Sequence, residues 1–139
     1  MSFREKSTWI TFVLLLGFGI YFGDVALHML DPTRAHANYL QLFVLLVVAI
    51  VVLEIITHVV IAIRSPREAQ TPIDERERLI ELRSMRPAFF VLLVGAFLSV
   101  GTIHLGASTW VLTHCVLFAI WMAELTRYGS RLYHYRRSA

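Results

Sequence analysis

Four long apolar stretches constrain the fold of this 139-residue chain more than any other feature. They cover residues 9–30, about 39–63, 87–105 and about 109–125. Each approaches the roughly 20 residues that a helix needs to cross the hydrocarbon core of a bilayer. Backbone groups in lipid need internal partners, and the period-2 alternation of barrel strands is absent. We therefore expect an all-α, integral membrane four-helix bundle.

Composition supports a membrane protein. Hydrophobic residues make up 57% of the chain and charged residues 17%, whereas soluble domains average about 45–50% and about 25%. Mean hydropathy is +0.63. These values exclude a disordered chain, a basic nucleic-acid-binding tail and an ordinary soluble enzyme domain. The single cysteine, Cys115, excludes a disulfide framework.

The distribution of positive charge predicts the orientation of the chain. Of the thirteen Lys and Arg residues, only Arg34 falls between the first two apolar stretches, and the third and fourth are joined by a turn without any. Positive residues favour the cytoplasmic side of a membrane. We expect a multi-pass protein of the bacterial inner membrane with both termini and segment 64–86 in the cytoplasm.

Segment 64–86 has a helical pattern of its own. Thr71 and Pro72 are typical of a helix start, and apolar residues alternate with charged ones after them. This predicts a short amphipathic helix at the cytoplasmic interface, with a solvated charged linker as the alternative. Pro87 disfavours helical geometry at the preceding residue, so we expect the third span to begin afresh there. The single membrane domain, 1–139, then comprises hairpin one (9–63), this segment, hairpin two (87–126) and a basic tail (127–139).

The two hairpins look like copies of one unit. A shift of 76 residues places Gly19 on Gly95, Gly23 on Ser99 and His28 on His104, and a shift of 70 places Glu54 on Glu124. The spacing of small residues, Gly19-x-x-x-Gly23 and Gly95-x-x-x-Ser99, is typical of close helix packing in membranes. We expect these four residues to be helix-packing positions.

The second half of the chain resembles a known family. The run DERERLI at residues 74–80 precedes a membrane hairpin, and Glu124 is followed by a tail containing Tyr133, Tyr135, Arg136 and Arg137. Both features resemble a family of small uncharacterised bacterial and archaeal membrane proteins with a D-E-R-x-x-x-I motif, over residues 74–137. The resemblance implies no enzyme activity. Some members accompany small DNA-binding regulators, which implies a membrane partner or a regulatory role.

Four ionisable residues are expected near the outer ends of the spans. Asp24 and His28 share a helical face, and His104 and His114 flank the turn between the third and fourth spans. Three imidazoles and a carboxylate are a suitable ligand set for Zn²⁺ or Cu²⁺, and a histidine pair is suited to haem. Interfacial placement or hydrogen bonding between helices explains the same residues without a ligand.

Two ionisable residues fall in the inner half of the second span. Glu54 and His58 stand four residues apart, so they are expected to pair with each other. The pair suits either a structural lock or a proton relay. Glu124 is expected in an ion pair with the arginines of the inner interface.

The sequence therefore favours a non-enzymatic small membrane protein that acts as an accessory or regulatory subunit through helix–helix packing. No phosphate-binding glycine loop, nucleophile elbow or C-x-x-C motif is present. We expect no cofactor, no nucleic acid, and as partners the lipid bilayer and either a homo-oligomer or a larger membrane complex. A haem- or metal-binding redox protein and a small proton-coupled transporter subunit are the alternatives.

Overall fold

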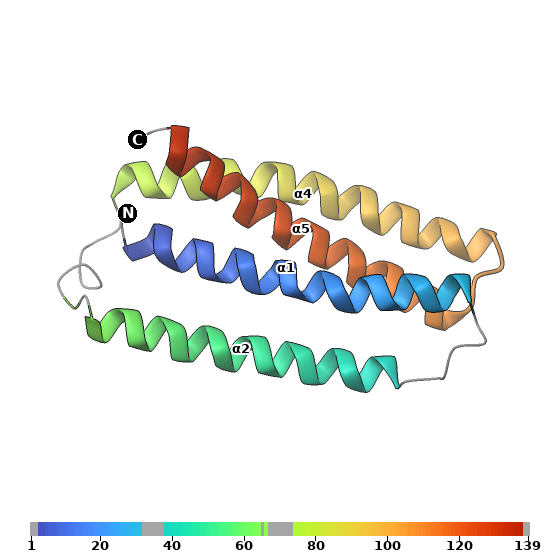
Figure 1. Cartoon of the computed structure of the whole chain (residues 1–139). Helices are drawn as coiled ribbons and strands as arrows, with labels where there is room; N and C mark the ends of the chain where they lie inside the picture. Colours follow the sequence, from blue (N-terminus) through green and yellow to red (C-terminus); the bar gives the residue numbers. More distant parts are fainter. Residues whose placement is uncertain (1–2, 32–37, 65, 67–73, 138–139) are drawn as a thin grey trace. The chain divides into compact units, whose positions relative to one another are not determined.

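The structure is a computed structural model that describes residues 3–31, 38–64, 66 and 74–137. Its helices are α1 (Phe3–Leu30), α2 (Tyr39–Arg64), α4 (Glu75–His104) and α5 (Thr109–Arg137) (Figure 1). All four are long and apolar enough to cross a membrane, and the described residues contain no β-strand. The expected all-α fold of membrane-spanning helices is confirmed. The chain divides into two compact units, Met1–Pro72 and Ile73–Ala139.

Hairpin one consists of α1 and α2, which run antiparallel. Ser7 and Thr11 near the start of α1 contact His58 and Glu54 near the end of α2. At the other end of the hairpin, the Tyr21 hydroxyl donates a hydrogen bond to the backbone oxygen of Tyr39 over 3.1 Å. The half-buried residues of α2 recur every three or four positions, as one face of a helix requires. They are Phe43, Leu46, Ile50, Glu54, Thr57, His58, Ile61 and Ala62.

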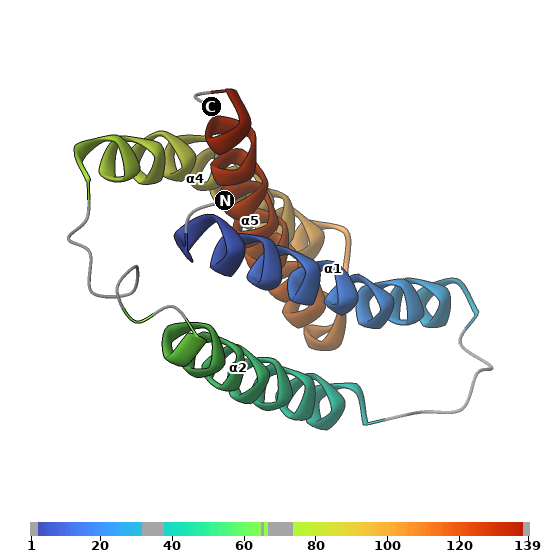
Figure 2. The same ribbon diagram turned by 60° about the vertical axis from the view of Figure 1, so that its left-hand side comes forward.

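Hairpin two consists of α4 and α5, which pack closely side by side (Figure 2). A turn after His104 joins them, and Gly106 adopts a left-handed conformation with φ of 74°. Gly106 and Ala107 donate backbone hydrogen bonds to Ile103 and Thr102, which closes the end of α4 in a Schellman motif. The Ser108 hydroxyl then accepts a hydrogen bond from the backbone of Val111 over 3.4 Å, capping α5.

The start of the third span differs from the prediction. Helix α4 runs without interruption from Glu75 through Pro87 to His104. Ser84 and Ala88, on either side of the proline, are both buried. Packing of this segment therefore outweighs the local cost of the proline, as neighbouring helices often allow in membrane proteins. The amphipathic segment is thus the first part of a single 30-residue helix. Thr71 and Pro72, expected at its start, lie outside the described residues.

The basic tail is also helical. Helix α5 continues from the fourth apolar stretch to Arg137. Leu132 and Tyr135 within this continuation are buried. We call the end of hairpin two that carries Glu75 and Arg137, away from the turn, its open end.

Candidate functional site

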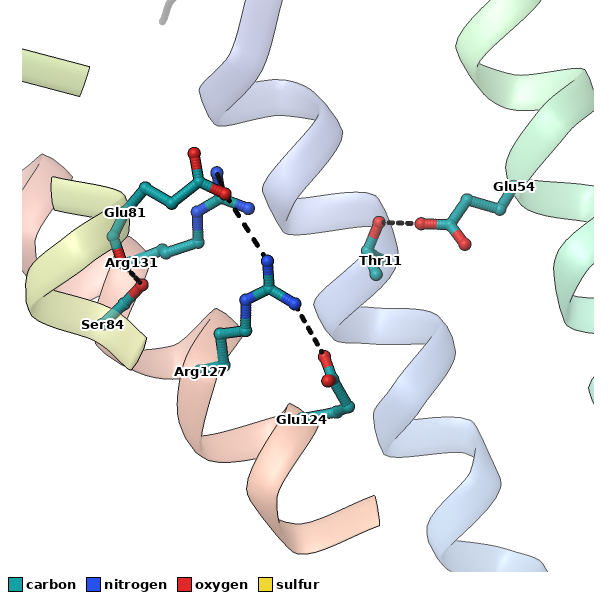
Figure 3. Close-up of polar contacts among 7 residues, drawn as sticks. All are labelled: Thr11, Glu54, Glu81, Ser84, Glu124, Arg127 and Arg131. Carbon is teal, nitrogen blue, oxygen red and sulfur yellow. Dashed lines mark hydrogen bonds and ion pairs between the residues drawn. The ribbon is translucent and has the colours of Figure 1, made fainter. Parts of the chain in front are cut away.

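A polar clasp joins the two helices of hairpin one. The Thr11 hydroxyl on α1 donates a hydrogen bond to Oε1 of Glu54 on α2 over 2.6 Å (Figure 3). One turn away, the Ser7 hydroxyl contacts Nε2 of His58. Both pairs of residues are spaced four apart, so the two contacts stack along one face of each helix. Hydrogen bonds between membrane helices contribute roughly 0.6–2 kcal/mol each.

The hydrogen bond of His58 to its own helix defines the role of Nδ1. Nδ1 lies 2.7 Å from the backbone oxygen of Glu54, and a carbonyl oxygen can only accept a hydrogen bond. Nδ1 therefore carries a hydrogen atom and donates a hydrogen bond to this oxygen. Nε2, on the other side of the ring, contacts the hydroxyl of Ser7. Both imidazole nitrogens are used in packing contacts within hairpin one.

The predicted Glu54–His58 pair is therefore built differently. The His58 ring meets the backbone oxygen of Glu54, while the Glu54 carboxylate meets Thr11. The two α1 hydroxyls were not anticipated. Their spacing of four residues, matching that of Glu54 and His58 on an antiparallel helix, is the sequence signal that points to them.

An ion-pair cluster lies at the open end of hairpin two. Arg127 and Arg131 on α5 both approach Oε1 of Glu81 on α4, at 3.5 and 3.6 Å (Figure 3). Arg127 also lies 3.5 Å from the carboxylate of Glu124 on its own helix. Glu124 thus has an arginine partner, as its position suggested. The shared acceptor, Glu81, had been assigned only to a charged amphipathic segment.

The end of hairpin one where α1 ends and α2 begins is organised around Tyr39. The Tyr39 hydroxyl donates a hydrogen bond to Oδ2 of Asp24 over 3.2 Å. The buried ring of His28 packs against the Tyr39 ring, with centroids 5.1 Å apart. Four further aromatic rings pack against one another and extend this cluster: Phe18, Tyr21, Phe22 and Phe43. Asp24 and His28 are therefore both placed against one phenol ring.

The other two predicted metal ligands belong to hairpin two. His104 is exposed at the end of α4. His114 is buried, its Nδ1 donates to the backbone oxygen of Trp110 over 2.8 Å, and its ring stacks 4.2 Å from the Trp110 ring. No group of three or more His, Cys, Asp or Glu residues within the described part of the chain is arranged to hold a metal ion. The four-residue set draws on both units and stays a prediction.

The small residues divide between the two hairpins. A Cβ at Gly95 would lie 2.5 Å from Cβ of Ala119 on α5, and Ser99 is buried at 2% exposure. A Cβ at Gly23 would meet no atom within 4 Å. Gly19 on α1 is half-buried. The Gly95 and Ser99 face packs within its own hairpin, whereas Gly23 is exposed.

Neither the protein-family models, the curated proteins nor the solved structures gave a match to this chain.

Proposed function

We propose that this chain is a non-enzymatic accessory or regulatory subunit of a larger assembly in the bacterial inner membrane. Its intramembrane polar residues hold each hairpin together, and its exposed helix faces meet other membrane proteins. Both termini and segment 64–86 face the cytoplasm in this proposal, because nearly all the Lys and Arg residues flank that side.

The exposure of α2 carries the proposal. It is the most hydrophobic of the four helices, with a mean hydropathy of 3.0 over its most apolar 18 residues, and none of those residues is buried. Only one face of α2 is used against α1. Within hairpin one, the rest of the α2 surface is left for lipid or for another helix.

The polar contacts support a packing role over transport. The sequence positions of Glu54 and His58 are compatible with a proton relay. In the structure, however, each side chain contacts a hydroxyl group of α1. The His58 Nδ1 is further committed to the backbone of Glu54. These contacts give the two residues a structural task within hairpin one.

Site-specific photo-crosslinking in native membranes tests the proposal. A benzophenone amino acid at Val48 or Val52, both exposed on α2, should form adducts with another membrane protein. The matched control is Phe43, whose ring contacts Phe18 and Tyr21 of α1, and which should crosslink only within the chain. Adducts with lipid alone, or only with a second copy of the chain, would contradict the role as an accessory subunit.

A further inference from the structure

We propose that Arg127 and Arg131 form a binding site for the phosphate of an anionic phospholipid at the open end of hairpin two. This inference rests on the membrane-spanning topology that also underlies the proposed function. It adds a specific lipid partner, which that proposal does not name.

Arg127 and Arg131 lie side by side and share one acceptor. They stand one helical turn apart on α5 and share Oε1 of Glu81. The guanidinium carbons of both arginines lie 5.8 Å from the centroid of the Tyr128 ring. Their side chains are 27% and 20% exposed, so the pair is held against the helices and still reaches the surface.

The hydrogen-bonding capacity of this pair exceeds what the protein supplies. Each guanidinium has five N–H donors, and its contacts with Glu81 are longer than the about 2.7–2.9 Å of a tight charge-assisted bond. Among the described residues, none accepts a hydrogen bond from the buried Nε of Arg127 or of Arg131. The planar guanidinium fork can bind a phosphate with two parallel hydrogen bonds, through the nitrogens that reach the surface.

The surrounding charge favours an anion. Residues 74–137 contain eight arginines and five acidic residues. The last part, 125–137, holds four of the arginines and no acidic residue. Glu81 and Glu124 offset two of these charges, so the open end of hairpin two keeps an excess of positive charge.

The depth of the pair identifies a lipid as the source of the phosphate. At 1.5 Å per residue, Arg127 lies about 26 Å and Arg131 about 32 Å along the helix from Trp110. A hydrocarbon core is about 30 Å thick. When Trp110 sits at one interface, the two guanidinium groups therefore reach the phosphate layer of the other. Tyr128 is also typical of that layer, where aromatic residues gather.

The test uses the purified full-length chain in neutral detergent, with native mass spectrometry and thermal unfolding as readouts. Phosphatidylglycerol is added at increasing concentration, and phosphatidylcholine with the same acyl chains serves as the neutral comparison. We expect phosphatidylglycerol to bind at least five-fold more tightly and to raise the melting temperature more. Equal binding of both lipids would overturn the proposal. An equal effect of soluble glycerophosphate would do so as well, because the lipid would then contribute nothing.

Three variants locate the site. Arg131→Gln should weaken phosphatidylglycerol binding about five-fold, the effect of removing one basic residue near a lipid surface, and Arg131→Lys should fall between it and the wild type. Arg136→Gln, which removes the same charge from an exposed position on the same helix, should stay within two-fold of the wild type. An equal loss in Arg136→Gln would overturn the site, because charge alone would then explain the binding.

A fourth variant separates lipid binding from folding. Glu81→Gln removes the carboxylate that competes for both arginines, so phosphatidylglycerol affinity should rise even where the ion pair contributed to stability. This readout remains informative if Arg131→Gln fails to fold. A fall in affinity after Glu81→Gln would show that the arginines serve only the packing of α4 against α5. The lipid result is independent of the crosslinking result, since a chain without a protein partner can still prefer anionic lipid.

Discussion

A single methyl group on Gly95 should separate the helices of hairpin two. The Cβ of Gly95→Ala would lie 2.5 Å from Cβ and 3.3 Å from Cα of Ala119. Unstrained carbon atoms stay about 3.5–4.0 Å apart, so the helices must move by about 1 Å. Overpacking of this kind costs roughly 1–3 kcal/mol, and the better helix propensity of alanine returns up to about 1 kcal/mol. We expect a net loss of about 1–2 kcal/mol, because neither Ala119 atom can rotate away.

Unfolding of the purified chain by SDS titration in mixed micelles, followed by circular dichroism, measures this loss. Gly101→Ala is the matched control, because it lies on the same helix and its Cβ would meet nothing within 4 Å. Adding Ala119→Gly to Gly95→Ala removes the closest contact and should restore most of the stability. Equal stability of Gly95→Ala and Gly101→Ala, or no recovery of stability with Ala119→Gly, would contradict a close contact between α4 and α5 at Gly95.

Two further predictions concern hairpin one and the topology. Thr11→Val should lower the free energy of unfolding by about 1–3 kcal/mol, because the Glu54 carboxylate loses its partner on α1; Thr57→Val, which loses only a bond to its own helix, should cost less, and an equal loss in both would count against the clasp. In a variant without the native cysteine, an impermeant maleimide added outside the cell should label Thr33→Cys and spare Gln70→Cys until the membrane is opened. Labelling in the reverse order would contradict the assigned orientation.

The length of the apolar stretches was sufficient to predict four helices. A helix in lipid satisfies its own backbone, so composition alone decides its presence. The turn of hairpin two can also be predicted from the sequence, because Gly106 and Ser108 act through local backbone geometry. These features depend on residues that are close together in the sequence.

The features that sequence reasoning missed depend on contacts between distant residues. Pro87 follows a local rule that predicts a break, but burial of the neighbouring Ser84 and Ala88 decides the outcome. The role of Thr11 cannot be predicted from the sequence alone, because its hydrogen bond to Glu54 depends on the register of α1 against α2. Glu81 was assigned to a charged segment, and its two arginine partners lie about 50 residues further along the chain.

Because α4 continues as one helix through Pro87, the open end of hairpin two extends well beyond the apolar part of that helix. Thirty residues form a rod about 45 Å long, some 15 Å longer than a hydrocarbon core. A helix of this length that stands upright in a bilayer would project beyond the hydrocarbon core beside the extension of α5, where the ion pairs of Glu81 join the two helices. A change of about 20° in the tilt of this hairpin, an ordinary value for a membrane helix, would swing the tip sideways by about 5 Å. Because the proline lacks a backbone N–H donor, the open end bends most easily where it leaves the apolar part of the helix.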